Sequence, residues 1–295
     1  MNSTEFLSLL DQKPTLVLDG ATGTNLQKRG LPIGTSPETW LFDNPAGISQ
    51  LYSDFVQAGS DIILTSTFGG NRTRLGHANL AEQLPEVNQT AVQLAKKVTA
   101  GKNVLVAGSL GPTGEMMQPF GTMSEEQAFE IYAEQAKILL EAGVDLLVIE
   151  TQFDINEAQQ AVKAVRSLSN EIALVCSFSY DRGVRTMMGV KPAQMAEIFN
   201  EMAVDALGVN CGKSLEDNLN VLTTLKENTD KPIWFKPNAG LPTSNPDGST
   251  TYDVTPEMMA EKVPTWIAAG ARLIGGCCGT SPDHLAAIAK MIRNE

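Results

Sequence analysis

Apolar residues occur along this chain in short runs that return at regular intervals between longer amphipathic stretches. Eight segments are rich in β-branched and other apolar residues, and they cover 15–19, 61–65, 103–109, 145–150, 171–177, 205–210, 232–236 and 271–276. Most of these segments are continuously apolar rather than alternating, which is typical of parallel strands that are covered on both faces. The pattern therefore predicts eight buried strands.

The stretches between these segments have the amphipathic pattern of surface helices, most clearly over 124–142, 154–169 and 214–229. Ser124 and Asp154 each stand three residues before a glutamine or glutamate, which is the pattern of a capping box at the start of a helix. Several of the expected helices end in an Ala-Gly pair, and glycine tolerates the left-handed conformation that ends a helix. Strands and helices therefore alternate, as in an α/β fold.

Eight strand–helix units in 295 residues, with no break in composition, predict a single-domain (β/α)8 TIM barrel over 1–295. The alternative is an open doubly wound sheet, in which a glycine-rich nucleotide-binding loop follows the first strand. The residues after the first segment, DGATGT at 19–24, do not match the GxGxxG pattern of that loop. We therefore expect the closed barrel.

The functional residues of such a barrel lie at the carboxyl ends of its strands. The residues found there are mostly polar or carry thiols, and they are Asp19, Thr65, Ser109, Glu150, Ser177, Asn210, Cys211, Asn238, Cys277 and Cys278. Cys211 ends the sixth strand, and the pair Cys277 and Cys278 ends the eighth. The barrel would therefore bring three thiols from distant parts of the chain to one rim.

Two adjacent cysteines suit a disulfide poorly, because a bond between neighbours strains its geometry. Zinc accepts thiolate ligands and prefers four of them, so three sulfurs leave one position open, as in catalytic zinc sites. A lone cysteine is more often a small buried hydrophobic residue, which is what we expect of Cys176 in its apolar run. Convergence on one rim instead predicts a Zn²⁺ site formed by Cys211, Cys277 and Cys278.

The composition excludes several classes of function. A net charge of −12 argues against nucleic acid as a partner and disfavours anionic membranes, and no apolar run has the ~18 residues that a membrane helix needs. The first residues do not resemble a signal peptide, and four cysteines fit a reducing environment, so we expect a cytoplasmic protein. The two histidines, His77 and His284, leave little material for histidine-based catalysis, and we expect both in surface or loop positions.

Several motifs occur in the order that is typical of the homocysteine S-methyltransferase family. They are DGATGT at 19–24, TSTFG at 65–69, ET at 150–151, NC at 210–211, PNAGLP at 237–242 and GGCCGT at 275–280. The chain resembles this family from about residue 13 to its end. Because of the PNAGLP stretch, it most resembles the homocysteine-binding module of cobalamin-dependent methionine synthase.

The resemblance implies a zinc-dependent transfer of a methyl group to the thiol of homocysteine, which gives methionine. By position in the motifs, Cys211, Cys277 and Cys278 would hold the zinc, and Asn238 would fill its open position until substrate arrives. The substrate-binding residues would be Gly20 and Ala21 at the carboxylate, Asp19 and Glu150 at the ammonium group, and Asn210 and Asn238. Asp19 and Glu150 also have a simpler interpretation as residues that cap strand ends, and Thr65 and Thr67 are expected to be structural.

Zinc would do the work of a histidine base here. A free thiol has a pKa near 8.5 and is mostly protonated at neutral pH, whereas coordination to zinc removes its proton. We expect a methyl-corrinoid as the donor, brought by a separate corrinoid protein, with the loop 111–121 facing it. A sulfonium or betaine donor, a different thiol acceptor, a module excised from a larger enzyme, and a non-catalytic zinc-thiolate sensor remain alternatives.

Overall fold

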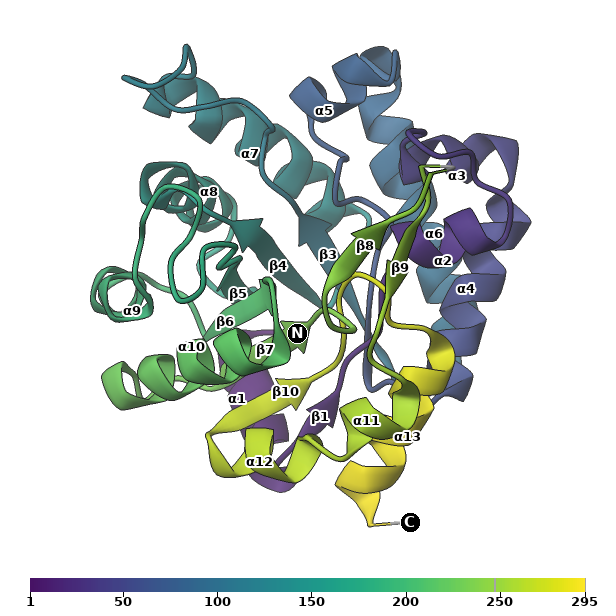
Figure 1. Ribbon diagram of the computed structural model, residues 1–295. Coiled ribbons are helices and arrows are strands. Elements are labelled where there is room, and N and C mark those ends of the chain that lie inside the picture. Colours follow the sequence, from purple (N-terminus) through teal and green to yellow (C-terminus); the bar gives the residue numbers. More distant parts are fainter. Residues whose placement is uncertain (247, 295) are drawn as a thin grey trace.

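The computed structural model describes residues 1–246 and 248–294, and eight parallel strands form its centre (Figure 1). These strands are β1 (Leu16–Val17), β2 (Ile62–Leu64), β3 (Leu105–Leu110), β4 (Leu146–Gln152), β5 (Ala173–Phe178), β6 (Ala206–Cys211), β7 (Ile233–Pro237) and β10 (Ala271–Ile274). Their order in the sheet is β1-β10-β7-β6-β5-β4-β3-β2, and a parallel bridge from Leu18 to Ile62 joins the two end strands. The sheet is therefore closed, and the predicted (β/α)8 barrel is confirmed.

Helices surround the barrel. They are α1 (Ser3–Gln12), α2 (Gly23–Lys28), α3 (Trp40–Asp43), α4 (Pro45–Gln57), α5 (Arg72–His77), α6 (Leu84–Thr99), α7 (Glu125–Glu141), α8 (Ile155–Leu168), α9 (Pro192–Asn200), α10 (Leu215–Asn228), α11 (Pro256–Ala260), α12 (Val263–Ala268) and α13 (Pro282–Arg293). Two short 3₁₀ helices cover Pro37–Thr39 and Ala81–Gln83. Among these described helices, none has the length and apolarity that crossing a bilayer requires.

The helix starts agree with the capping signals in part. Ser124 and Gln127 form the complete capping box that the sequence predicts for α7. Asp154 caps α8 through the backbone N–H groups of residues 156 and 157, but Glu157 does not complete a box. Its buried side chain instead accepts hydrogen bonds from the backbone and the hydroxyl of Thr113, in the loop after β3.

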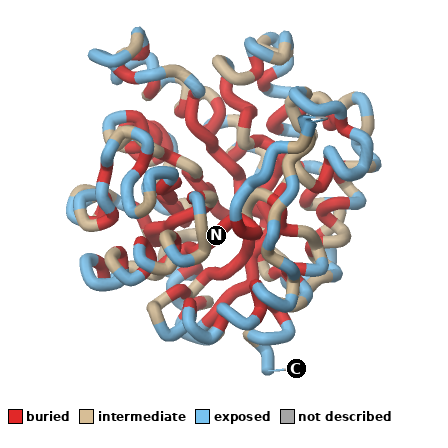
Figure 2. Tube along the Cα trace, in the orientation of Figure 1, coloured by how far each residue is buried: buried red, intermediate tan, exposed pale blue. Residues whose placement is uncertain are grey.

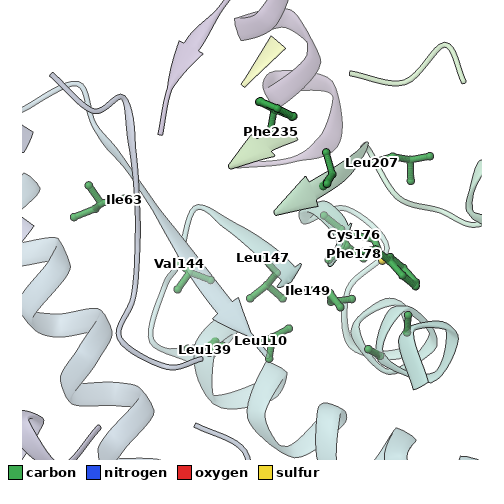
Figure 3. Close-up of a cluster of buried hydrophobic side chains, with 14 of the residues drawn as sticks. Ile63, Leu110, Leu139, Val144, Leu147, Ile149, Cys176, Phe178, Leu207 and Phe235 are labelled. Carbon is green, nitrogen blue, oxygen red and sulfur yellow. The ribbon is translucent and has the colours of Figure 1, made fainter. Parts of the chain in front are cut away.

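The strands are apolar on both faces because they separate two hydrophobic layers. Leu146 and Val148 belong to the cluster inside the barrel, whereas Leu147 and Ile149 of the same strand belong to the cluster beneath the helices. Figure 3 shows part of this outer layer, and it includes Cys176, which is fully buried and is a core residue as expected. In Figure 2 the buried residues follow the strands, and the exposed residues lie on the helices and loops around them.

Two elements were not expected from the apolar pattern. Helix α1 packs Phe6 and Leu10 into the cluster inside the barrel, and the backbone N–H of Ser3 donates to the carbonyl of Glu171 just before β5, so α1 covers the amino end of the barrel. The second element is an antiparallel hairpin of β8 (Pro242–Ser244) and β9 (Thr250–Tyr252), which follows β7 (Figure 1).

The role of α1 can be tested with two adjacent positions. Phe6 is fully buried, so Phe6→Ala should lower the free energy of unfolding by about 3–5 kcal/mol through lost burial and a cavity. Leu7 on the same helix is 40% exposed, and Leu7→Ala should change it by no more than about 0.5 kcal/mol. Urea denaturation of both variants measures the difference, and equal effects would show that α1 does not seal the barrel.

Candidate active site

Three cysteine thiols meet at the carboxyl end of the barrel. Cys211 is the last residue of β6, Cys277 and Cys278 follow β10, and β7 lies between these two strands in the sheet. The three sulfur atoms all lie within 4.8 Å of one another, and Cys211 Sγ is 2.8 Å from Cys277 Sγ. That distance is longer than the ~2.05 Å of a disulfide, and all three are free thiols.

The backbone is shaped to aim these sulfurs at one another. Cys211 has a φ of 58°, in the left-handed region that a residue with a side chain rarely adopts and that is typical of functional sites. The side-chain amide of Asn218 donates to the carbonyl of Cys211 over 2.7 Å and holds this turn in place. On the other side, the N–H of Cys277 donates to the carbonyl of Pro237 at the end of β7, over 2.8 Å.

The side chain of Asn210 contacts two of the three thiols. Its Oδ1 accepts hydrogen bonds from the backbone of Thr151 and from the hydroxyl of Ser177. Its Nδ2 donates to Thr151 Oγ1 and lies 3.7 Å from Cys211 Sγ and 3.9 Å from Cys277 Sγ. The side chain is fully buried, so the structure places Asn210 behind the thiols, where it can donate to two of them.

The three thiols share one proton network. Hydrogen bonds from Cys211 and Cys277 to its sulfur hold the pKa of Cys278 well below the usual range, whereas the same contacts raise the pKa of Cys211. These contacts therefore favour the thiolate form of Cys278 over that of Cys211. A metal ion would displace the remaining protons on binding, so its affinity should fall in acid.

The residues around the thiols fit a thiophilic metal ion. Among the described residues, Cys211, Cys277 and Cys278 form the only group of three or more His, Cys, Asp or Glu side chains whose ligand atoms lie close enough to share one ion. Asn238 adds an independent sign: its Nδ2 donates to the carbonyl of Gly212, but its buried Oδ1 has no hydrogen-bond partner. A buried oxygen without a partner is costly, and a metal ligand is one way to satisfy it.

A cavity of about 830 Å³ opens onto these thiols. Cys211, Cys277 and Cys278 line it together with Gly20, Ala21, Ser109, Glu150 and Lys236, and Phe68, Arg74 and His77 are also among its lining residues. The volume falls in the range that is usual for small-molecule sites. Asp19, Asn210 and Asn238 are not among the lining residues.

Asp19 is paired with Lys236, a residue that the sequence interpretation missed. Lys236 Nζ lies 2.5 Å from Asp19 Oδ1, the backbone N–H of Leu64 donates to Asp19 Oδ2, and both charged side chains are almost fully buried. Burial raises the pKa of Asp19, although the positive charge of Lys236 opposes this rise. Burial alone would lower the pKa of Lys236, but attraction to Asp19 and Glu150 outweighs that effect and the pKa of Lys236 is raised. A charged residue at the end of an apolar strand was the signal for Lys236.

Of the two acids Asp19 and Glu150, only Glu150 lines the cavity. Its side chain is buried, and Ser109 Oγ donates to its Oε1 over 2.5 Å. Burial raises the pKa of Glu150 to about 7, against the opposing attraction of Lys236, and ionisation of Cys277 would add to the rise. A cationic group bound in the cavity would favour the ionised form of Glu150.

Gly20 and Ala21 lie at the cavity wall between these groups. A side chain at Gly20 could not be accommodated, because its Cβ would lie 2.8 Å from Leu285 and 2.9 Å from Thr280 Oγ1. The backbone N–H of Ala21 already donates to Thr280 Oγ1 over 3.2 Å, and its carbonyl accepts from Asn25. This stretch therefore packs tightly against the turn that carries Cys277.

Other expectations have mixed outcomes. The loop 111–121 is not among the lining residues, but Arg74, which lines the cavity, donates to the carbonyl of Pro112. His77 is an exposed residue at the end of α5, as expected. The expectation for His284 was wrong: it is buried in α13, where its ring contacts Ser281 at the helix start and lies 3.0 Å from the carbonyl of Val254.

Fold and site together define a barrel protein whose rim can bind a metal through three thiols beside a small-molecule cavity. Comparison with known proteins then identifies the family. Residues 16–292 match the sequence model of the homocysteine S-methyltransferase family, and this chain belongs to that family.

The relatives include both single barrels and longer proteins. The chain is 30% identical over 310 residues to the homocysteine S-methyltransferase YbgG of Bacillus subtilis, with 97% of each chain covered. It is 28% identical to the methionine synthase of Mycobacterium leprae, and it spans 25% of the length of that protein. The metallated crystal structure of the homocysteine methyltransferase MmuM from Escherichia coli matches with a TM-score of 0.80 and 29% identity, covering 96% of this chain and 98% of that one.

The raised pKa of Glu150 makes stability depend on pH. In the metal-free protein Glu150 holds its proton up to a pKa of about 7, against an ordinary value of 4.5, so its contribution is full below pH 4.5 and is lost as pH rises through 7. Glu150→Gln keeps the uncharged form at every pH. The free energy of unfolding of the variant should therefore gain about 3 kcal/mol on that of the wild type between pH 4 and pH 8. Parallel stability curves from urea denaturation would contradict this.

Proposed function

We propose that this protein catalyses the zinc-dependent transfer of a methyl group to the thiol of homocysteine, giving methionine. The observation that carries the proposal is the convergence of Cys211, Cys277 and Cys278 in the lining of a small-molecule cavity, in a member of this family. Three thiolates leave one of the four positions that zinc prefers open for the sulfur of the substrate.

Bound zinc would supply the positive charge that removes the proton from the substrate thiol near neutral pH. Cys211, Cys277 and Cys278 would hold the ion, and Asn238, whose buried Oδ1 has no hydrogen-bond partner, would be a ligand before substrate binds. Because three cysteine thiolates would already donate charge to the metal, the substrate sulfur would keep its nucleophilic character. No histidine base is required.

The cavity places acids and backbone around the amino-acid part of homocysteine. Glu150 faces the cavity and binds the ammonium group, and Asp19, held by Lys236, adds negative charge behind it. The backbone at Gly20 and Ala21 lies at the cavity wall and contacts the carboxylate. When the ammonium group binds, Glu150 loses the proton that it holds part of the time at neutral pH.

The reaction moves one methyl group and one proton. An electron pair on the substrate sulfur forms the new bond to the methyl carbon, and the bond from that carbon to the donor breaks with its electrons staying on the donor. The thiol proton leaves to solvent. The products are methionine and the demethylated donor.

We propose a methyl-corrinoid donor, brought by a separate corrinoid protein in the cytoplasm. Phe68 is the single Phe, Tyr or Trp among the described residues that line the cavity, and the guanidinium of Arg74 lies 5.9 Å from its ring centre. Cationic donors such as a sulfonium or a betaine are typically held against several aromatic faces. A positive charge over the one ring in this cavity disfavours them.

The proposal is tested with purified protein, homocysteine, and methylcobalamin, S-methylmethionine or betaine in parallel. Methionine should form fastest with methylcobalamin in the zinc-loaded wild type. Cys211→Ala should bind almost no zinc and form methionine only at the background rate, because one of three protein ligands is lost. Cys176→Ala, in the core and away from the cavity, should keep both properties.

Each of the other outcomes would point to a different function. Full activity in Cys211→Ala would refute the zinc site as the catalytic centre. Faster methylation with S-methylmethionine or betaine would replace the corrinoid donor with a small one. If the zinc-loaded wild type methylates other thiols but not homocysteine, the acceptor is a different thiol. If it methylates no thiol, the protein is better explained as a non-catalytic zinc-thiolate sensor.

A further inference from the structure

Tyr252 reaches the metal centre from the hairpin that the sequence pattern did not predict. It is the last residue of β9, and it lies beside the turn that carries Cys278. The ring lies against the backbone at Gly279, where an added Cβ would be 2.3 Å from Tyr252 Cγ. The absence of a side chain at Gly279 therefore lets the tyrosine approach the residue before it.

The base of the hairpin is fixed to the same turn. The backbone N–H of Ala239 donates to the carbonyl of Cys278 over 2.9 Å, and the N–H of Val254 donates to the carbonyl of Ala239. Asp253 Oδ1 accepts from the N–H of Leu241 and closes the base of the hairpin. The position of Tyr252 is thus fixed beside Cys278 by main-chain hydrogen bonds at the base of the hairpin and by the packing of its ring on Gly279.

The charge of the site requires such donors. Three cysteine thiolates and a substrate thiolate carry two negative charges more than a divalent ion neutralises. Asn210 Nδ2 lies near the sulfurs of Cys211 and Cys277, and no contact with Cys278 is formed by that amide. A tyrosine hydroxyl is protonated at neutral pH and can donate to a thiolate. A tyrosine beside Cys278 can therefore do for the third sulfur what Asn210 does for the other two.

We propose that Tyr252 is a positioning residue of the metal centre, which orients Cys278 as a ligand and withdraws charge from its sulfur through a hydrogen bond. The inference rests on the proposed function only in that Cys278 binds zinc. Residues that hydrogen-bond to metal ligands orient them and tune the metal, and their loss commonly weakens metal binding by about 10–100-fold. The hairpin β8–β9 then has a defined task, which is to carry this tyrosine.

The test compares Tyr252→Phe with Thr251→Val, an exposed neighbour on the same strand. Tyr252→Phe keeps the ring and removes only the donor. Competition with a chelator should show zinc binding at least ~10-fold weaker in Tyr252→Phe and unchanged in Thr251→Val. In the cobalt-substituted protein, the sulfur-to-cobalt charge-transfer band should move to lower energy in Tyr252→Phe alone, because an unbonded thiolate gives up charge more easily.

Equal zinc affinity and equal cobalt spectra in Tyr252→Phe and the wild type would overturn the inference. So would a metal-free Tyr252→Phe chain that unfolds at a clearly lower temperature than the wild type, because the hydroxyl would then serve folding rather than the metal. If Tyr252→Phe binds zinc more weakly than the wild type but the wild type does not methylate homocysteine, the proposed function is overturned and this inference stands.

Discussion

The convergence of three thiols across strand β7 is the constraint on which the rest of the site depends. Cys211 and the pair Cys277 and Cys278 come from strands on either side of β7, and parallel strands bring their carboxyl ends to one rim. Sulfurs within 4.8 Å of one another repel when ionised, unless a cation or hydrogen-bond donors compensate them. The surrounding residues supply part of such compensation, through the side-chain amide of Asn210 and the positive charge of Lys236.

The barrel also explains why the acids of the site differ. Asp19 is paired with Lys236 and does not line the cavity, whereas Lys236 does. Glu150 lies at the cavity with Ser109 as its hydrogen-bond partner and has a raised pKa. The two carboxyl groups therefore differ in their surroundings, because Asp19 contacts a buried ammonium group directly and Glu150 contacts a hydroxyl group and the cavity.

The sequence was sufficient for the barrel and for the three thiols, because both depend on local patterns. Buried parallel strands need continuous apolar runs, and the residue after each run falls at the rim, which identifies Cys211 and Cys277 without any knowledge of contacts. Helix α1 and the hairpin β8–β9 leave no such pattern. The exposed residues of β8 show no apolar alternation, and α1 is defined by where Phe6 packs.

The remaining features depend on pairings between distant residues. Lys236 forms its ion pair with a residue 217 positions earlier, and the placement of Asn210 behind the thiols depends on contacts with Thr151 and Ser177. His284 was misjudged for the same reason, since its burial follows from the carbonyl of Val254 that meets its ring. Such contacts are set by the closed barrel and cannot be read from composition or spacing.

X-ray absorption at the zinc edge tests the central claim most directly, because it counts the sulfur atoms around the ion. The account predicts three sulfurs at about 2.3 Å and one lighter atom in the zinc-loaded protein, changing to four sulfurs when homocysteine is added. Fewer than three sulfurs in the free protein, or a sulfur count that homocysteine does not raise, would contradict the claim that three cysteines hold a zinc ion with a position reserved for the substrate thiol.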